Sequence, residues 1–160
     1  MTHNTEWDLA ALIERGGVHY DVPGANRNEF LSTLTGLLPA GPDPEHLYRE
    51  ILEREALVST GVGRGIALPH PRSPDNENGG PFVSLAFPGQ PLDWNTQDGS
   101  RVHTVFLIVS SSAKQHLNVL SKINFLCQQE KFYSLIYSRA SPESIITAIR
   151  EAETTWKRKE

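Results

Sequence analysis

Residues 59–70 read STGVGRGIALPH, and this stretch carries the strongest signal in the chain. Glycine stands at positions 61, 63 and 65. Because glycine has no Cβ, such a run lets the backbone take positive φ and bring its N–H groups close to an anion. The run lacks the Gly-Lys-Ser or Gly-Lys-Thr ending of a P-loop and the spacing of the dinucleotide fingerprint. From the glycines alone, a structural turn and a phosphate-binding loop both stay open.

The last residue of the stretch, His70, stands between Pro69 and Pro71. The two prolines have fixed φ angles and stiffen the backbone on either side, so the imidazole is presented rigidly. Imidazole titrates near neutral pH, and one nitrogen can attack phosphorus while a hydrogen bond to the other fixes the tautomer. On this evidence His70 is either a nucleophile or an ordinary loop histidine.

Three further motifs accompany this stretch: Arg54-Glu55-Ala56-Leu57 before it, Asp98-Gly99 before an apolar run, and His116-Leu117 at the start of a helical pattern with Leu120 one turn on. Together with residues 59–70 they resemble the signature of the fructose-mannitol type Enzyme IIA domains of the bacterial phosphoenolpyruvate-dependent sugar phosphotransferase system. That family includes the nitrogen-regulatory Enzyme IIA proteins. The resemblance extends from about residue 17 to 149 and is strongest over residues 54–126. It implies one α/β domain over residues 1–160, with a mixed β-sheet flanked by helices on both faces.

The resemblance also implies that His70 is the phosphorylated residue and that Arg54 and His116 complete the site. A guanidinium can pair two phosphoryl oxygens, and a second imidazole can donate a hydrogen bond or adjust the pKa of the nucleophile. Further donors to the phosphoryl group are expected from the loop: the Thr60 hydroxyl and the amides of Gly61 and Val62. The plainer alternatives are a solvated helix-end charge for Arg54 and a partly buried cap residue for His116.

The family implies a phosphocarrier that accepts its phosphoryl group from an HPr-like protein. We expect a regulatory, nitrogen-type role, in which the phosphorylation state decides which target protein is bound, because no IIB or membrane IIC segment is present in the sequence. The alternative is a sugar-transport Enzyme IIA that passes the group to a separate IIB subunit of a fructose- or mannitol-type permease. A third possibility is a fold that has lost phosphotransfer, and the presence of Arg54, His70 and His116 together argues against it. No cofactor is expected, and no cysteine or histidine spacing suggests a metal site.

One departure from the family pattern follows the histidine, where many members have a small residue and this chain has Pro71-Arg72. Arg72 either adds positive charge near the phosphoryl site or is simply exposed to solvent. The other histidines, His19, His46 and His103, are expected at the surface or packed against a strand.

Composition excludes several classes of protein. With 15 Lys and Arg against 19 Asp and Glu, the formal charge is −4 and gives no basic field for nucleic acid. The longest apolar stretch, residues 102–109, is far shorter than the roughly 20 residues of a membrane span. The N-terminus lacks a secretory pattern, and the single cysteine, Cys127, cannot form an internal disulfide. We therefore expect a cytoplasmic protein in which Cys127 is a small buried hydrophobe.

Periodicity and breaker residues predict helices alternating with strands, which is typical of a layered α/β domain. Helices are expected over residues 5–15, 26–38, 43–55 and 114–130, and from Ser141 onward with Ile145, Ile146 and Ile149 inward. The helix over 114–130 is expected to bury Leu117, Leu120, Ile123 and Leu126 or Cys127. Strands are expected over residues 18–22, 82–87 and 101–109, the last central in the sheet, with an exposed loop over 71–81.

Overall fold

The computed structural model describes residues 8–38, 43–73 and 79–159, and its centre is a five-stranded sheet. The strands are β1 (Val18–Val22), β2 (Gly61–Gly63), β3 (Ile66–Ala67), β4 (Phe82–Pro88) and β5 (Thr104–Val109). Their order across the sheet is β1-β4-β5-β3-β2. The pairs β1–β4 and β3–β5 are parallel, while β4–β5 and β2–β3 are antiparallel. The predicted mixed sheet is confirmed.

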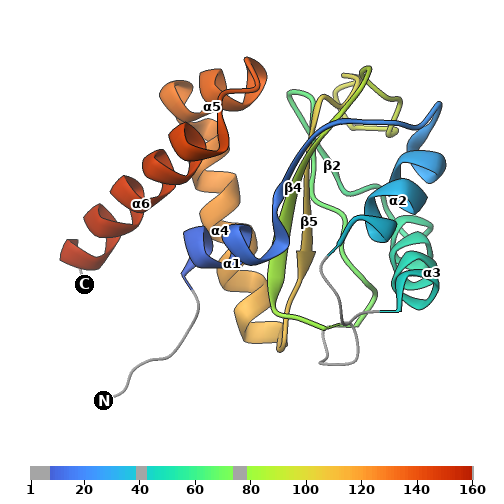
Figure 1. The fold of residues 1–160 in the computed structure, drawn as a ribbon, viewed down its shortest axis with the longest axis horizontal. Helices are drawn as coiled ribbons and strands as arrows, with labels where there is room; N and C mark the ends of the chain where they lie inside the picture. The colour runs from blue at the N-terminus through green and yellow to red at the C-terminus, as the bar shows by residue number, and fades with distance from the viewer. Residues whose placement is uncertain (1–7, 39–42, 74–78, 160) are drawn as a thin grey trace.

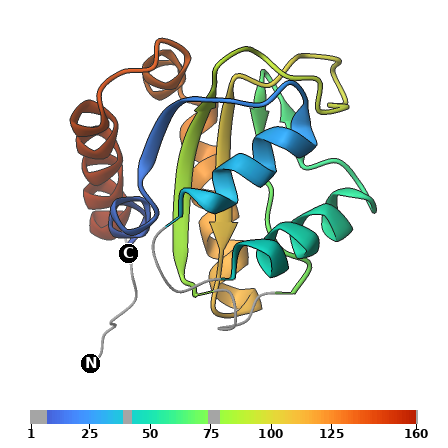
Figure 2. The same ribbon diagram turned by 45° about the vertical axis from the view of Figure 1, so that its right-hand side comes forward.

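Helices cover both faces of this sheet, as Figures 1 and 2 show from two directions. One face carries α2 (Arg27–Gly36) and α3 (Pro44–Glu55), which pack on each other. The other face carries α1 (Leu9–Gly16), α4 (Ala113–Gln128), α5 (Glu130–Tyr137) and α6 (Pro142–Lys159). The described chain is therefore a three-layer α/β domain with the sheet in the middle, as expected.

Alternating strand residues separate the core into two clusters. On β4, Val83, Leu85 and Phe87 belong to the cluster beneath α1 and α4–α6, whereas Phe82 and Ala86 belong to the cluster beneath α2 and α3. β5 alternates in the same way and is buried along its whole length. This two-sided burial explains the nearly continuous apolar run and confirms β5 as a central strand. The strand is shorter than predicted, because Val102 makes only an isolated bridge with Leu92.

Local capping chemistry starts three of the helices where the sequence predicts. Asn26 Oδ1 accepts a hydrogen bond from the Glu29 amide at 2.9 Å, at the start of α2. Asp43 caps α3 ahead of Pro44, and Ser141 Oγ accepts from the Ser144 amide at 3.1 Å near the start of α6. Side-chain acceptors satisfy amides that have no partner within the helix, which is why these starts can be predicted locally.

Three expectations need correction. The helix predicted over 114–130 is two helices, α4 and α5, which meet at Gln129. Leu117 was expected inward but is 66% exposed, and Val119 is buried in its place. At about 100° per residue, two positions turn Leu117 to the opposite side of α4 from Val119, Ile123 and Leu126, which face the sheet. The glycine-rich stretch also contains a short hairpin, β2–β3, that no periodicity predicted.

Some predictions fall partly outside the described residues. The first helix was expected from residue 5, but residues 1–7 are not described, and α1 begins at Leu9 with Asp8 as its cap. Residues 39–42 and 74–78 are likewise outside the description. Cys127 is buried as predicted, and burial raises the pKa of its thiol to about 12.

Candidate functional site

The β2–β3 hairpin carries the chain to His70 along the side of β5. Arg64 and Gly65 form the turn and both have positive φ, as a two-residue type I′ hairpin requires. β3 then runs parallel to β5, and the Pro69 carbonyl accepts a hydrogen bond from the Ile108 amide at 3.0 Å. His70 is therefore held beside the C-terminal end of the central strand.

The ring of His70 is anchored at one nitrogen. Its Nδ1 lies 2.8 Å from the Leu68 carbonyl oxygen, which can only accept, so Nδ1 carries the proton. In the described ranges no hydrogen bond reaches Nε2, so its lone pair is available. Burial lowers the pKa of His70, and the charge of Arg54 lowers it further against the opposing effect of the Leu68 hydrogen bond. His70 is thus a neutral imidazole at pH 7, which is the form required of a nucleophile.

His116 lies in the first turn of α4, directly beside His70. The Ser112 side chain caps this helix, and the ring centroids of the two histidines are 4.4 Å apart at an interplanar angle of 58°. Nδ1 of His116 is 3.5 Å from the hydroxyl of Ser110, which is itself buried. Burial lowers the pKa of His116 to about 4, with further contributions from the charges of His70 and Arg54. This second imidazole is therefore also neutral at pH 7.

Arg54 stands in the last turn of α3. Its Nη1 donates to the Val58 carbonyl at 2.8 Å, which folds the side chain over the loop that follows the helix. Its positive charge is the smallest of the causes that lower the pKa of His70 and His116. The ring contact brings His70 and His116 together, while the expected part of Arg54 in the site stays a prediction.

Two of the expected donors of the loop, the Thr60 hydroxyl and the Gly61 amide, have other partners. The Thr60 amide donates to Glu55 Oε1 at 3.1 Å, and the Thr60 hydroxyl donates to Glu55 Oε2. The Gly61 amide donates to Ser59 Oγ at 3.0 Å. Val62 lies in the middle of β2 with its side chain 52% exposed. Thr60 and Gly61 therefore stabilise the base of the hairpin in this structure, and the expected donation to a phosphoryl group by Thr60, Gly61 and Val62 stays a prediction.

Glu55 is a site residue that the sequence reasoning missed. Its carboxylate is buried and accepts from both Thr60 donors and from Trp94 Nε1 at 3.3 Å, with Arg27 Nη1 at 3.9 Å. The residue directly follows Arg54, so these bonds hold the end of α3 against the hairpin. The sequence signal for Glu55 was an acidic residue directly after Arg54, but two of its partners, Arg27 and Trp94, are distant in sequence.

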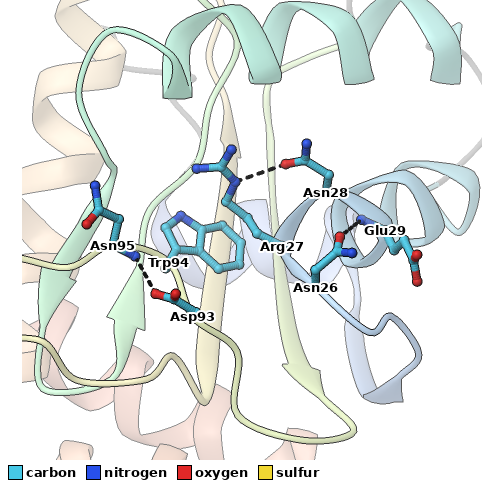
Figure 3. A pocket seen from close by; sticks show the side chains of 7 residues that line it. All are labelled: Asn26, Arg27, Asn28, Glu29, Asp93, Trp94 and Asn95. Carbon is cyan, nitrogen blue, oxygen red and sulfur yellow. Dashed lines mark hydrogen bonds between the residues drawn. The ribbon is translucent and has the colours of Figure 1, made fainter.

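Two hollows differ in their chemistry. A small one of about 120 Å³ lies at the histidines and is lined by His70, Pro71, Arg72, Ile108, Ser110 and His116. A wider one of about 550 Å³ lies beside the start of α2 and is lined by Asn26, Arg27, Asn28, Glu29, Asp93, Trp94 and Asn95 (Figure 3). The wider hollow contains two carboxylates, and its one guanidinium is bonded to the Asn28 side chain. Phosphoryl chemistry fits the smaller hollow better, because carboxylates repel a phosphoryl group.

In the described ranges, no three His, Cys, Asp or Glu side chains gather closely enough to hold a metal ion. None of the described helices has the length and apolar character needed to cross a bilayer.

The family model for the phosphoenolpyruvate-dependent sugar phosphotransferase system, EIIA 2, matches residues 12–152. The chain belongs to this family. Among relatives of this EIIA 2 chain, the multiphosphoryl transfer protein of Shigella flexneri is 26% identical over 155 residues, covering 94% of this chain and 18% of that protein. The fructose-specific EIIABC component of Bacillus subtilis is 32% identical over 148 residues, covering 89% and 23%. The nitrogen regulatory protein of Pseudomonas aeruginosa is 24% identical over 151 residues, covering 91% and 96%.

The EIIA 2 chain thus spans about a fifth of the length of the multiphosphoryl transfer protein that it matches. Solved structures share its fold. The nitrogen regulatory protein IIA-Ntr from Neisseria meningitidis superposes with a TM-score of 0.73 at 21% identity, covering 82% of this chain and 92% of that one. The Escherichia coli complex of enzyme IIAMTL and phosphorylated enzyme IIBMTL gives a TM-score of 0.66 at 15% identity, covering 84% and 94%.

Proposed function

We propose that this EIIA 2 domain is a phosphocarrier whose acceptor atom is His70 Nε2. The observation that carries the proposal is the state of one ring: Nδ1 is protonated and held by the Leu68 carbonyl, while Nε2 is unbonded in the described chain. A nucleophile needs this combination of a fixed tautomer and an available lone pair. The neighbouring Arg54 and His116 supply charge and a second imidazole.

The proposed step is an in-line transfer from the phosphohistidine of an HPr-like protein. The Nε2 lone pair of His70 forms the new P–N bond as the donor's N–P bond breaks, and the electron pair of that bond returns to the donor imidazole. Arg54 pairs two oxygens of the transferring group, and His116 donates to it when its Nε2 is protonated. Because such a transfer depends on positioning and charge stabilisation, a small open site between two docked proteins is enough.

For the acceptor we favour a regulatory target protein. Likeness along 96% of the nitrogen regulatory protein of Pseudomonas aeruginosa supports this choice. The alternative acceptor is the IIB subunit of a sugar permease, supported by 32% identity to the Bacillus subtilis fructose component and by the shared fold of IIAMTL in its complex with IIBMTL.

Phosphorylation in vitro tests the proposal. Incubation with Enzyme I, an HPr-type carrier and phosphoenolpyruvate should add one acid-labile phosphate, and His70→Ala should add none. Full labelling of His70→Ala would overturn the assignment. To separate the two acceptors, phosphorylated protein is mixed with a purified fructose-type IIB domain. Loss of the label to IIB supports the sugar route, and retention of the label supports the regulatory role.

A further inference from the structure

One arginine, Arg72, lines the small hollow at the histidines. It does so together with His70, Ser110 and His116, from the loop after β3. Arg54, at the end of α3, does not line the hollow, and its charge contributes to the lowered pKa of both histidines. The arginine that borders the imidazole pair in the structure is therefore Arg72.

The backbone before Arg72 is fixed. The Pro69 carbonyl is bonded to the Ile108 amide of the central strand, and Pro71 is buried. Proline holds φ near −65°, so Pro71, the one residue between His70 and Arg72, has little backbone freedom. The backbone of Arg72 is therefore positioned by the same anchor that positions His70 itself.

The guanidinium of Arg72 is also uncommitted within the described chain. Arg64, Arg139 and Arg150 each form an ion pair with a carboxylate. For Arg72 no hydrogen bond or ion pair is formed with the residues of the described ranges, and the residue is exposed. An unpaired cation at the edge of the hollow can bind an incoming anion without first breaking a bond.

We infer that Arg72 is a second phosphoryl-binding residue, which pairs the oxygen that Arg54 leaves free and holds the group on the side of Ser110. The inference rests on the proposed phosphocarrier function and names a further residue of the same site.

Charge and geometry both support this role. A phosphoryl group carries a charge of about −2 at neutral pH, whereas Arg54 supplies one positive charge and His116, with its pKa lowered to about 4, supplies none. A guanidinium fork pairs two oxygens, and the group has three. While the bond to His70 forms and the donor bond breaks, negative charge is spread over all three equatorial oxygens. Arg72 supplies the missing charge and the partner for the third oxygen.

Rapid-quench kinetics with the phosphorylated HPr-type carrier test the inference. The limiting rate of transfer to His70 and the carrier concentration for half-maximal rate are measured for wild type, Arg72→Gln, Arg72→Lys and Arg101→Gln. Arg101 is the matched control, an exposed arginine at the opposite end of β5 from Ser110. We expect Arg72→Gln to lower the limiting rate roughly 10-fold, less than the 10²–10³ typical of an enclosed donor because Arg72 is exposed. Arg72→Lys should recover part of the rate, since it keeps the charge but loses the fork.

Two results would overturn the inference. One is an unchanged limiting rate in Arg72→Gln, which would make Arg72 a solvated charge. The other is a higher half-maximal concentration at an unchanged limiting rate, which would assign Arg72 to partner docking. In both cases wild-type labelling on His70 persists, so the phosphocarrier function stands. If wild type takes no phosphate on His70, the proposed function fails and this inference fails with it.

Discussion

His70 and His103 are both half-buried histidines beside opposite ends of the central strand β5, but their bonding differs. His103 uses both nitrogens: Nδ1 lies 2.7 Å from the Thr104 hydroxyl, and Nε2 lies 3.1 Å from both the Arg64 carbonyl and the Tyr133 hydroxyl. His70 uses Nδ1 alone. Burial is the largest cause of a lowered pKa in each. A depressed pKa therefore does not separate the two residues, whereas the unbonded nitrogen of His70 does.

Arg54 and Arg64 differ in the same way as the two histidines. Arg64, in the hairpin turn, lies 4.0 Å over the Tyr133 ring, 3.1 Å from Glu130 and 3.4 Å from the Cys127 carbonyl. Among the described residues, the Arg54 side chain makes one hydrogen bond, to the Val58 carbonyl. The hairpin tip is thus tied to α4 and α5 by a closed set of contacts. At the other end of the hairpin, the Arg54 side chain and Nε2 of His70 keep hydrogen-bonding capacity that the described residues do not use. We therefore expect the chemistry at that end.

Exchanging His70 and His103 for asparagine, one at a time, should give the largest effect and separate the roles of the two histidines. His70→Asn should abolish phosphate incorporation, because the nucleophilic nitrogen is gone, while leaving the unfolding free energy almost unchanged. His103→Asn should keep the labelling and lower the unfolding free energy by about 1–3 kcal/mol, because the buried Thr104 hydroxyl and the half-buried Tyr133 hydroxyl each lose a partner. Intact-mass measurement of the phosphate and urea denaturation give the two readouts. Stable labelling of His70→Asn, or loss of labelling in folded His103→Asn, would contradict the comparison.

Exchanging Arg54 and Arg64 for glutamine, one at a time, should give the next largest effect. Arg54→Gln should slow transfer to His70 about 100-fold, the order of magnitude for removing a preorganised donor to developing negative charge. Arg64→Gln should leave the transfer rate within about 3-fold, because its contacts all lie at the hairpin tip, and should instead lower the melting temperature. Rapid-quench kinetics and thermal denaturation of both variants provide the measurement. Equal rate losses in the two variants would show that the hairpin tip and the site act as one unit.

A smaller effect is expected at Tyr133, whose hydroxyl donates to the Arg64 carbonyl at 2.7 Å. Tyr133→Phe keeps the ring beneath Arg64 and removes the hydroxyl, with its bond to the Arg64 carbonyl and its contact with His103 Nε2 at 3.1 Å, so we expect a loss of about 1 kcal/mol in unfolding free energy. The phosphorylation rate should not change. Tyr137→Phe is the control, since that residue is 65% exposed and contacts His103 only through its ring. A rate loss in Tyr133→Phe with unchanged stability would link the hairpin tip to the chemistry.

Sequence predicted the parts of this fold that depend on local chemistry. The caps at Asn26, Asp43 and Ser141 bond to amides two or three residues away, so their helices could be located from the sequence. The break between α4 and α5 was missed because Gln129 carries neither glycine nor proline chemistry, yet it leaves the helix at φ −83° and ψ 123°. The β2–β3 hairpin was missed because three glycines mask any alternation of side chains.

The site was harder to predict than the helix caps, because its contacts join residues that are distant in sequence. The expected grouping of Arg54, His70 and His116 came from family resemblance, since no periodicity relates residues on three elements, and their roles stay predictions. The partners of Thr60 could not be predicted, because its acceptor Glu55 is fixed in turn by Trp94, 39 residues further along the chain. The absence of a hydrogen bond or ion pair between Arg72 and the described residues could not be predicted either, because it too depends on tertiary packing.

The electrostatic coupling between His70 and His116 should give the smallest effect. Burial is the largest cause of the His116 pKa near 4, followed by the charges of His70 and Arg54. In His70→Gln the second cause disappears while burial stays, so the pKa of His116 should rise only part of the way toward the usual value of about 6.5. Ring signals of His116 followed by NMR during a pH titration measure this shift. His103 is the internal control, because His70 is not among the causes of its lowered pKa.

The same depressed pKa fixes the sign of the pH dependence of stability. Between about pH 6.5 and 4 the unfolded chain binds a proton at residue 116 that the folded chain does not, so the unfolding free energy falls as the pH falls through this window. His116→Asn should reduce that fall, and His70→Gln should also reduce it, since it removes one of the three causes of the His116 shift together with the lowered pKa of His70 itself. Urea denaturation at pH 7 and pH 4.5 gives the comparison. An unchanged His116 titration in His70→Gln would mean that the two rings do not share one electrostatic site, despite centroids 4.4 Å apart.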